Sequence, residues 1–438
     1  MKKLFIETYG CQMNVADSEV VASILSDNYE ITDDEAAADL ILINTCSIRD
    51  NAEQRIHKRL RELAALKRKN RDLTIGLLGC MAERLKETLL GNGSVLDFIA
   101  GPDAYRSLPE LIKKAETEEI AFNVELSKTE TYDDIMPVRY DANGVSAFIS
   151  IMRGCNNFCS YCVVPYTRGR ERSRSPQTII REANDLIEKG YKEIILLGQN
   201  VNSYLWKEND TEITFAKLME MVALLNEDVR VRFATSHPKD ISDDLLYVMA
   251  KHHNICKFIH LPVQSGSNEV LKKMNRVYTR EYYLDRVAKI KEIMPDCSLA
   301  TDVIAGFCGE TEEQHKETLS LMREVGFASA YMFKYSVREG TMSAKKFEDD
   351  VPDEVKSRRL EEIIALQQQL SLESNRMDIG KTFEVLVEGV SKRSDEQLFG
   401  RNSQNKVIVF PKNDYKKGDY VTVRVTDCTA ATLKGEIV

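Results

Sequence analysis

The sequence predicts an α/β chain of three domains: an N-terminal open parallel α/β sheet, a central partial (β/α)6 barrel and a C-terminal small β-barrel. Strand-like apolar runs alternate with segments of helical period along the first 100 residues, and six further runs recur between residues 147 and 334. Such alternation is typical of parallel sheets. From Gly380 onward the pattern changes to short β runs divided by turn signals. The length of 438 residues suits this division, since a domain holds about 100–200 residues.

The N-terminal domain is predicted over residues 1–125. Its strand-like runs are Lys3–Tyr9, Asp39–Asn44, Thr74–Leu78 and Val95–Ala100, and segments of helical period, such as Val20–Leu25 and Arg55–Leu66, separate them. Residues 116–134 then hold seven carboxylates and one lysine. That composition favours a linker or a solvated excursion between domains.

The central domain is predicted over residues 141–370. Its strand-like runs are Ala147–Met152, Glu193–Leu197, Arg230–Ala234, Phe258–Pro262, Leu299–Ile304 and Ala330–Lys334. Six such units over about 200 residues suit a barrel or an incomplete barrel, because a full eight-unit barrel needs about 250 residues. The helical pattern of Asp353–Arg376 bridges to the last domain.

The C-terminal domain is predicted over residues 376–438. Its short β runs are Thr382–Val387, Lys406–Pro411, Tyr420–Val425 and Thr432–Val438, and turn signals such as Lys417-Gly418-Asp419 divide them. This pattern favours a small β-barrel of the oligonucleotide-binding (OB) type.

Composition excludes several classes of protein. No apolar run approaches the roughly 18–20 residues of a membrane helix, and the N-terminus reaches Glu7 after only three apolar residues, too few for a signal peptide. We therefore expect a cytoplasmic protein with no membrane partner. The formal net charge of -9 excludes a uniformly basic nucleic-acid coat but leaves room for a local basic face. Ten cysteines in a reducing compartment favour metal or catalytic roles over disulfides.

The strongest motif is a C-x3-C-x2-C spacing, Cys155, Cys159 and Cys162, at the carboxyl end of a predicted strand. Three thiolates so close in sequence can surround one soft metal centre. A structural zinc site needs four ligands, and no histidine lies between positions 57 and 237 to serve as a local fourth. An iron–sulfur cluster with one open iron fits better, and zinc or inert thiols remain the alternatives.

A second set of cysteines is dispersed. Cys11, Cys46 and Cys80 lie 35 and 34 residues apart, and each follows a strand-like run. The carboxyl ends of parallel strands share one edge of a sheet, so these thiols can converge there, and Gly10 and Gly79 allow close backbone approach. Three ligands again leave one metal coordinate open; the alternative is that the thiols pack as small hydrophobes. The remaining cysteines share no such spacing and are predicted to be core or incidental: Cys256, Cys297, Cys308 and Cys428.

These motifs carry a resemblance to a known family. The C-x3-C-x2-C spacing with Tyr161 before its last cysteine, on the first strand of a six-unit series, resembles the radical S-adenosylmethionine (SAM) superfamily. With the second triad, the chain resembles the methylthiotransferase family of radical-SAM enzymes over essentially its whole length. Residues 8–14 (TYGCQMN) and 163–171 (VVPYTRGRE) are similar to the branch that acts on tRNA. Residues 399–406 (FGRNSQNK) resemble the signature of the RNA-binding barrel called TRAM, with Asn402 where threonine is commoner.

The resemblance implies two 4Fe-4S clusters, a radical-SAM cluster on Cys155, Cys159 and Cys162 and an auxiliary cluster on Cys11, Cys46 and Cys80. It implies that a methylthio group replaces the C2 hydrogen of N6-isopentenyladenosine at tRNA position 37, with two SAM molecules used per turnover. The strand-end loops of the barrel supply candidate SAM contacts, since barrel chemistry collects at that face. The candidates are Tyr161, Gln199, Asn200, Ser236, Gln264 and Asp302. An electron donor such as flavodoxin or ferredoxin is a further expected partner, and we expect a monomer.

The tRNA anticodon loop is the expected macromolecular partner, because single-stranded loops are the usual targets of sequence-specific RNA recognition. Residues 55–71 hold eight Lys or Arg against one Glu, which indicates either a phosphate-binding face or an ordinary solvated helix face. The arginines that follow the C-x3-C-x2-C motif can likewise contact phosphates or anchor the cysteine loop. The candidate RNA contacts are Arg59, Arg68, Arg168, Arg170, Arg401 and Lys406.

Two other functions stay open on the sequence alone. One is a sister methylthiotransferase that acts on threonylcarbamoyl-adenosine in tRNA or on an aspartate of a ribosomal protein. The other, of a different class, is a non-catalytic RNA-binding protein in which metals at both cysteine triads serve only stability.

Overall fold

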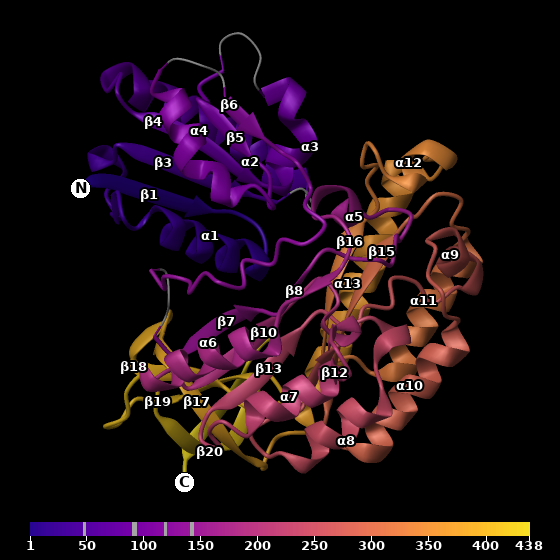
Figure 1. The fold of residues 1–438 in the computed structure, drawn as a ribbon. Helices are drawn as coiled ribbons and strands as arrows, with labels where there is room; N and C mark the ends of the chain where they lie inside the picture. The colour runs from indigo at the N-terminus through magenta and orange to yellow at the C-terminus, as the bar shows by residue number, and fades with distance from the viewer. Residues whose placement is uncertain (47–49, 90–93, 118–120, 141–143) are drawn as a thin grey trace. The chain divides into compact units, whose positions relative to one another are not determined.

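The computed structural model describes residues 1–46, 50–89, 94–117, 121–140 and 144–438 (Figure 1). The chain forms two compact units. The first combines Met1–Asp141 with Ser150–Asn157 and Cys162–Thr178, and the second combines Ala142–Ile149, Phe158–Tyr161 and Ile179–Val438. Among the described residues, no helix is long and apolar enough to cross a membrane.

The first unit is built on a parallel sheet with strand order β2-β1-β3-β4-β5-β6. The strands are β1 (Lys2–Thr8), β2 (Tyr29–Ile31), β3 (Leu40–Thr45), β4 (Thr74–Gly79), β5 (Phe98–Ala100) and β6 (Ala121–Asn123). Every residue of β3 and β4 is buried, as expected of central strands covered on both faces. The order reverses between β1 and β3, and ligands of such sheets bind beyond the carboxyl ends at that point.

Helices cover both faces of this sheet: α1 (Gln12–Leu25), α2 (Asp50–Lys69), α3 (Cys80–Leu89) and α4 (Leu108–Ala115), with short 3-10 turns at Glu35–Ala37 and Tyr105–Ser107. One core joins α1 and α4 to the sheet, through side chains such as Val21, Leu25 and Leu111. The other core joins α2 and α3 to the opposite face, with Ile56 and Met81 among its members.

The acidic segment 116–134, predicted as a linker or a solvated excursion between domains, packs in part onto the first unit. Strand β6 pairs with β5, and Tyr132 is buried and stacked on Tyr105. Arg106 pairs with both Glu130 and Asp134. Two carboxylates of this segment therefore have a cationic partner on the same unit, which composition alone does not reveal.

Two short strands, β8 (Met152–Arg153) and β9 (Arg172–Ser173), and helix α5 (Val164–Thr167) complete the first unit. Strands β8 and β9 pair antiparallel, so the chain before Cys155 lies beside the chain that follows α5. This hairpin-like pairing was not predicted, because two-residue strands leave no period in the sequence.

The second unit contains the six predicted barrel strands in two three-stranded sheets, of order β13-β10-β7 and β14-β15-β16. They are β7 (Ser146–Ser150), β10 (Glu193–Leu197), β13 (Arg230–Ala234), β14 (Phe258–His260), β15 (Ser298–Ala305) and β16 (Ser329–Lys334). The helices are α6 (Pro176–Glu188), α7 (Phe215–Ala223), α8 (Asp243–Lys251), α9 (Asn268–Lys273), α10 (Arg280–Ile293), α11 (Glu312–Val325) and α12 (Met342–Lys346). Short 3-10 turns at Val201–Ser203 and Pro238–Asp240 and an antiparallel hairpin, β11 (Leu205–Glu208) with β12 (Thr211–Thr214), are additions to the six-unit prediction.

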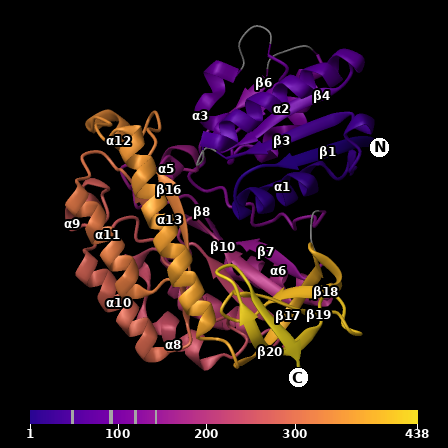
Figure 2. The same ribbon diagram turned by 180° about the vertical axis from the view of Figure 1, so that it is seen from behind.

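Helix α13 (Asp353–Arg376) has the predicted bounds and links the partial barrel to the last domain. It packs against β15, β16 and α11 and reaches the C-terminal barrel at β20 (Figure 2). The C-terminal strands form a closed barrel of order β17-β18-β19-β21-β20, with bounds Thr382–Ser391, Ser394–Arg401, Val407–Pro411, Leu433–Ile437 and Tyr420–Cys428 respectively. Strand β18 was not predicted, because its first half is polar and exposed.

Two arginines of β13 fasten the C-terminal barrel to the partial barrel. Arg230 donates to the backbone oxygens of Arg401 and Glu384 at 2.6 and 2.9 Å. Arg232 donates to the oxygens of Asn402 and Ser403 at 2.6 and 3.1 Å. The segment that resembles the TRAM signature thus has a structural role in this contact.

Candidate functional site

The three dispersed cysteines stand at the carboxyl ends of neighbouring strands, as predicted. Cys11 follows β1 and is the N-cap of α1, Cys46 follows β3, and Cys80 is the first residue of α3 after β4. Cys11 and Cys46 flank the point where the strand order reverses. The sheet therefore presents thiols where its ligands would bind.

Glycines allow these thiols to approach one another. Gly10 has a φ of +121°, and a Cβ there would overlap the Cβ of Cys46. Gly79 has a φ of +91°, and its Cβ would overlap the backbone oxygen of Thr45. Both positions combine a left-handed backbone with close contact, so both require glycine. A hydrogen bond with the Cys46 thiol, helped by the charge of Arg168, lowers the pKa of the Cys11 thiol to about 6.

Arg168 supplies a positive charge beside the thiols. Its Nε donates to Sγ of Cys80 at 3.2 Å, and its Nη2 donates to Oδ1 of Asn14 at 3.0 Å and to Oδ2 of Asp17 at 2.8 Å. The residue is 3% exposed. The prediction that Arg168 contacts RNA phosphates is wrong, because this guanidinium is buried and held by Asp17 and Cys80; the alternative role of anchoring the cysteine loop fits.

Asp17 joins Arg168 to the start of the C-x3-C-x2-C motif. Its other oxygen accepts from Arg153 Nη1 at 2.6 Å, and Arg153 also donates to the backbone oxygen of Pro102 at 2.8 Å. Burial alone would raise the pKa of Asp17, but the two guanidiniums bring it below its ordinary value. Arg153 precedes Gly154 and Cys155, so this carboxylate ties the motif to the N-terminal sheet.

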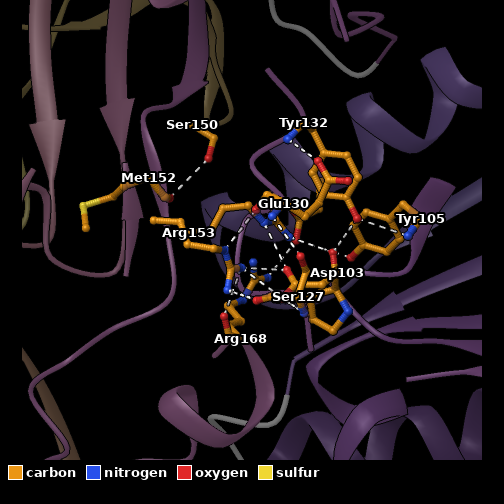
Figure 3. Close-up of polar contacts among 12 residues, drawn as sticks. Asp103, Tyr105, Ser127, Glu130, Tyr132, Ser150, Met152, Arg153 and Arg168 are labelled. Atoms are coloured by element: carbon orange, nitrogen blue, oxygen red, sulfur yellow. Dashed lines mark hydrogen bonds and ion pairs between the residues drawn. The ribbon is translucent and has the colours of Figure 1, made fainter. Parts of the chain in front are cut away.

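Around this pair lies a wider buried network (Figure 3). Arg153 stacks over the ring of Tyr132 at 4.9 Å, and the Tyr132 hydroxyl donates to Pro102 at 3.0 Å. Arg172 makes two bonds to Asp103, at 2.8 and 3.0 Å, and donates to the backbone oxygen of Ser127 at 2.7 Å. Of the arginines that follow the C-x3-C-x2-C motif, Arg168 and Arg172 thus anchor the loop, whereas Arg170 is exposed.

The backbone before Cys155 also depends on a glycine. Gly154 has a φ of +77°, and a Cβ there would overlap the backbone oxygen of Arg170. The amide of Cys155 donates to the oxygen of Gly169 at 3.1 Å. Cys155 and Cys162 belong to the first unit and Cys159 to the second.

In the second unit, Cys159 has an arginine partner of its own. Arg276 is buried, and its Nη1 donates to Sγ of Cys159 at 3.3 Å. Its Nη2 donates to the oxygen of Pro262 at 2.6 Å, which fixes the guanidinium. Tyr161 packs edge-on against Phe307 at 6.5 Å and is half-buried.

The strand ends of the partial barrel hold unsatisfied polar atoms. Gln199 Oε1, Asn200 Oδ1 and Ser236 Oγ are buried and have no hydrogen-bond partner within the described chain. Such atoms are uncommon and call for a ligand or a water. Gln264 has a left-handed φ of +74°, a strain that collects at functional sites. Asp302, on β15, accepts from His260 Nε2 at 2.7 Å.

The thiol chemistry fits iron–sulfur clusters. Across residues 1–46, 50–89, 94–117, 121–140 and 144–438, no three His, Cys, Asp or Glu side chains are close enough to hold a single metal ion. The ligands of a 4Fe-4S cluster bind different iron atoms, so their sulfurs need not come so close. Cysteine thiolates are the usual ligands of such clusters, and buried arginines beside Cys80 and Cys159 offset their negative charge.

The remaining RNA candidates differ in availability. Arg68 is exposed and lines a surface hollow of about 610 Å³ with Arg61, Lys67 and Arg71. Arg401 is half-exposed and pairs with Glu388. Arg59 pairs with Glu7, Glu35 and Glu62, and Lys406 pairs with Asp378. RNA would have to displace these carboxylates to reach Arg59 or Lys406.

Several residues of the site were missed from the sequence. Asp103 and Tyr132 lie far from the cysteine motifs along the chain, and Asp17, in the helix that follows Cys11, has no local spacing that marks it as a site residue. Arg276 lies 117 residues after Cys159, so only the fold reveals their contact. The signal that could have found Arg153 is its place directly before Gly154-Cys155. Of the four other cysteines, Cys256, Cys297 and Cys308 are buried as predicted, and Cys428 is partly exposed.

Comparison with known proteins identifies the family. Family models match at residues 3–101 (uncharacterized protein family UPF0004), 149–322 (radical SAM superfamily) and 376–438 (TRAM domain). Curated tRNA-2-methylthio-N(6)-dimethylallyladenosine synthases of Phocaeicola vulgatus and Bacteroides fragilis are both 60% identical over 437 residues, 99% of this chain and 96% and 95% of theirs. The chain belongs to this family. Membership in the tRNA-2-methylthio-N(6)-dimethylallyladenosine synthase family makes it a radical-SAM methylthiotransferase and confirms the resemblance seen in the motifs.

Solved structures share the fold at low identity. The radical S-adenosylmethionine methyltransferase TsrM of Kitasatospora setae, with cobalamin and a 4Fe-4S cluster bound, gives a TM-score of 0.56 at 12% identity, over 78% of this chain and 74% of that one. The cobalamin-dependent S-adenosylmethionine radical enzyme OxsB gives 0.52 at 13%, over 84% and 56%. This member of the synthase family thus has the predicted architecture: an N-terminal parallel sheet, a radical-SAM partial barrel and a TRAM barrel.

Proposed function

We propose that this protein inserts a methylthio group at C2 of N6-isopentenyladenosine at position 37 of tRNA, using two 4Fe-4S clusters and two SAM molecules per turnover. The 60% identity to curated synthases over 99% of the chain is the observation that carries the proposal. Convergence of Cys11, Cys46 and Cys80 on one sheet edge supports a second cluster, since a radical-SAM enzyme with a single cluster would need no thiols there.

The chain divides the work between two sets of ligands. Cys155, Cys159 and Cys162 would hold the radical-SAM cluster, and Cys11, Cys46 and Cys80 the auxiliary one. When bound, the clusters and SAM supply the radical chemistry that an unactivated C2–H bond requires. The protein positions the reactants, excludes water and sets the charge around the sulfurs through Arg168 and Arg276.

The candidate SAM contacts rest on unsatisfied polar groups. Gln199, Asn200 and Ser236 each keep a buried oxygen free of any partner in the described chain, and these oxygens can accept from an amino group or a ribose hydroxyl. Tyr161, Gln264 and Asp302 complete the proposed set. Each is a positioning contact rather than an acid or base.

For tRNA, the accessible cations favour Arg68, Arg170 and Arg401 as phosphate contacts. Bases of an anticodon loop are already largely unstacked, so extruding the target adenosine should cost little. We further propose a cytoplasmic monomer that draws electrons from a flavodoxin- or ferredoxin-type donor. Its domains would be residues 1–125, 141–370 and 376–438.

The decisive test is nucleoside mass spectrometry. Anaerobically reconstituted protein, SAM and a reductant are incubated with tRNA that carries isopentenyladenosine, and tRNA that carries threonylcarbamoyl-adenosine serves as the control. A methylthio mass gain on the first tRNA alone is expected. A gain on the control alone would assign the protein to a sister branch, and no gain on either would refute the proposed substrate.

Iron analysis tests the two-cluster part separately. The reconstituted protein should hold about eight iron atoms per chain, and the Cys155→Ala/Cys159→Ala/Cys162→Ala variant about four. Cys256→Ala, which removes a buried cysteine outside both sets, is the matched control and should keep about eight. Zinc in place of iron would favour the non-catalytic metal-stabilised reading.

A further inference from the structure

Arg168 has three nitrogens in one buried site, and only two of them have partners. Nε donates to Cys80 Sγ at 3.2 Å, and Nη2 donates to Asn14 and Asp17. Nη1 is buried and has no hydrogen-bond partner among the described residues. A charged donor left unbonded in the interior is costly, so its presence points to a missing acceptor.

The charge balance of the surrounding network also indicates that a negatively charged partner of Arg168 is missing. Three buried guanidiniums, those of Arg153, Arg168 and Arg172, face two buried carboxylates, those of Asp17 and Asp103. Both carboxylates are bonded by arginines on more than one side, which leaves one positive charge in excess. A buried unpaired charge is destabilising, and the thiol of Cys80, to which Arg168 Nε donates at 3.2 Å, is the candidate to neutralise it.

The location of the excess charge is fixed by the fold. Arg153 donates to Pro102 and stacks over Tyr132, and Arg172 is held by Asp103 and by the backbone oxygen of Ser127. Neither bonds to a sulfur atom of the described residues. Arg168 alone of the three bonds to a cysteine, so it is the arginine that presents positive charge to the thiol site.

We propose that Arg168 is a positioning residue of the auxiliary site: its Nε–H holds the Cys80 thiolate, and its free Nη1–H and its charge stabilise anionic sulfur bound there. This inference rests on the proposed function in taking Cys11, Cys46 and Cys80 as cluster ligands. Asp17 sets the guanidinium in place and, through Arg153, connects it to the loop that carries Cys155. Hydrogen bonds to sulfur and local charge are among the factors that set the reduction potential of an iron–sulfur cluster.

The test measures that potential in the full chain. The parent protein carries Cys155→Ala, Cys159→Ala and Cys162→Ala, so that only the auxiliary cluster is present. Arg168→Gln and Arg168→Lys are compared with the parent in redox titrations followed by electron paramagnetic resonance. Lys113→Gln is the matched control, because it removes a positive charge from an exposed position of the same unit.

We expect Arg168→Gln to lower the reduced-to-oxidised ratio at the parent's midpoint by at least tenfold, which for one electron corresponds to about 59 mV. Arg168→Lys, which keeps the charge but not the planar set of donors, should shift it less, and Lys113→Gln should not shift it. An Arg168→Gln protein with about four iron atoms and the parent's midpoint would overturn the inference.

Iron content and circular dichroism keep the outcomes distinct. If Arg168→Gln folds but does not hold iron, the inference is supported, because the residue is then needed to position Cys80. If both Arg168 variants misfold, the role is structural only and the inference fails. A parent protein that binds no iron would instead refute the two-cluster part of the proposed function.

Discussion

Removing Arg232 should destabilise the second unit strongly, because its contacts are buried and cannot be replaced by water. Its Nε donates to Glu193 at 2.5 Å, both side chains are 6% exposed, and its other nitrogens bond to the backbone of Asn402 and Ser403. Arg232→Met leaves a buried carboxylate with one remaining hydroxyl partner, Ser146. Breaking a buried pair in this way costs about 3–5 kcal/mol. We therefore expect a loss of about 4 kcal/mol in the free energy of unfolding.

Urea unfolding followed by tryptophan fluorescence measures this loss, since Trp206 is the only tryptophan and lies in the second unit. Lys251→Met is the matched control: it breaks an ion pair with Glu220 at the surface, where solvent screening leaves such pairs little effect on stability. The double variant Arg232→Met/Glu193→Leu should recover much of the loss, because no unpaired carboxylate remains. The reasoning is refuted if Arg232→Met costs no more than Lys251→Met.

Three further results are expected. Gly154→Ala should abolish binding of the radical-SAM cluster and leave about four iron atoms, because the added Cβ would overlap the backbone of Arg170. Gly190→Ala is the control, since Gly190 also has a left-handed backbone but a Cβ there meets no atom; this variant should keep about eight iron atoms. Burial lowers the pKa of His237 to about 2, so between pH 6.5 and that value only the unfolded chain protonates this imidazole. The free energy of unfolding should therefore fall by up to about 1.4 kcal/mol for each pH unit below 6.5. Denaturant titrations of His237→Gln should lack this contribution of the imidazole. Tyr132→Phe should cost about 1–3 kcal/mol in thermal unfolding, because the buried amide of Tyr105 and the buried carbonyl of Pro102 both lose its hydroxyl; an unchanged midpoint would contradict a role for these hydrogen bonds.

Much of the fold could be predicted because burial leaves a clear pattern in parallel strands. The continuous apolar runs of β3 and β4 and the amphipathic pattern of α13 gave bounds within a residue or two of the observed ones. Strand β18 lacks this pattern, since charged and amide side chains fill its first half and its pairing depends on strands β17 and β19. The pairing of β8 with β9 depends likewise on contacts between distant segments.

In the candidate site, too, some residues could be predicted from the sequence and others could not. The cysteines could be found because their spacing follows the strands, and the strands place them at one edge. The role of the arginines could not, because an arginine in sequence reads as exposed charge unless its carboxylate partner is known. Arg168 was interpreted as a phosphate contact for this reason, and only its distances to Cys80 and Asp17 correct that interpretation. The ion pairs of the acidic segment 116–134 could not be predicted for the converse reason, since their partner Arg106 lies outside the segment.

The composition of the first unit bears on how the protein is made. Asp17 and Asp103 are buried within the first 141 residues, yet the arginines that neutralise them come from segments 150–157 and 162–178. At about 5–20 residues per second, a ribosome needs roughly two to seven seconds to add the 37 residues between positions 141 and 178. During that interval the nascent N-terminal sheet has two carboxylates to bury and no cations for them. A gene truncated after residue 125 should accordingly yield an aggregating fragment, and extension to residue 178 should restore solubility.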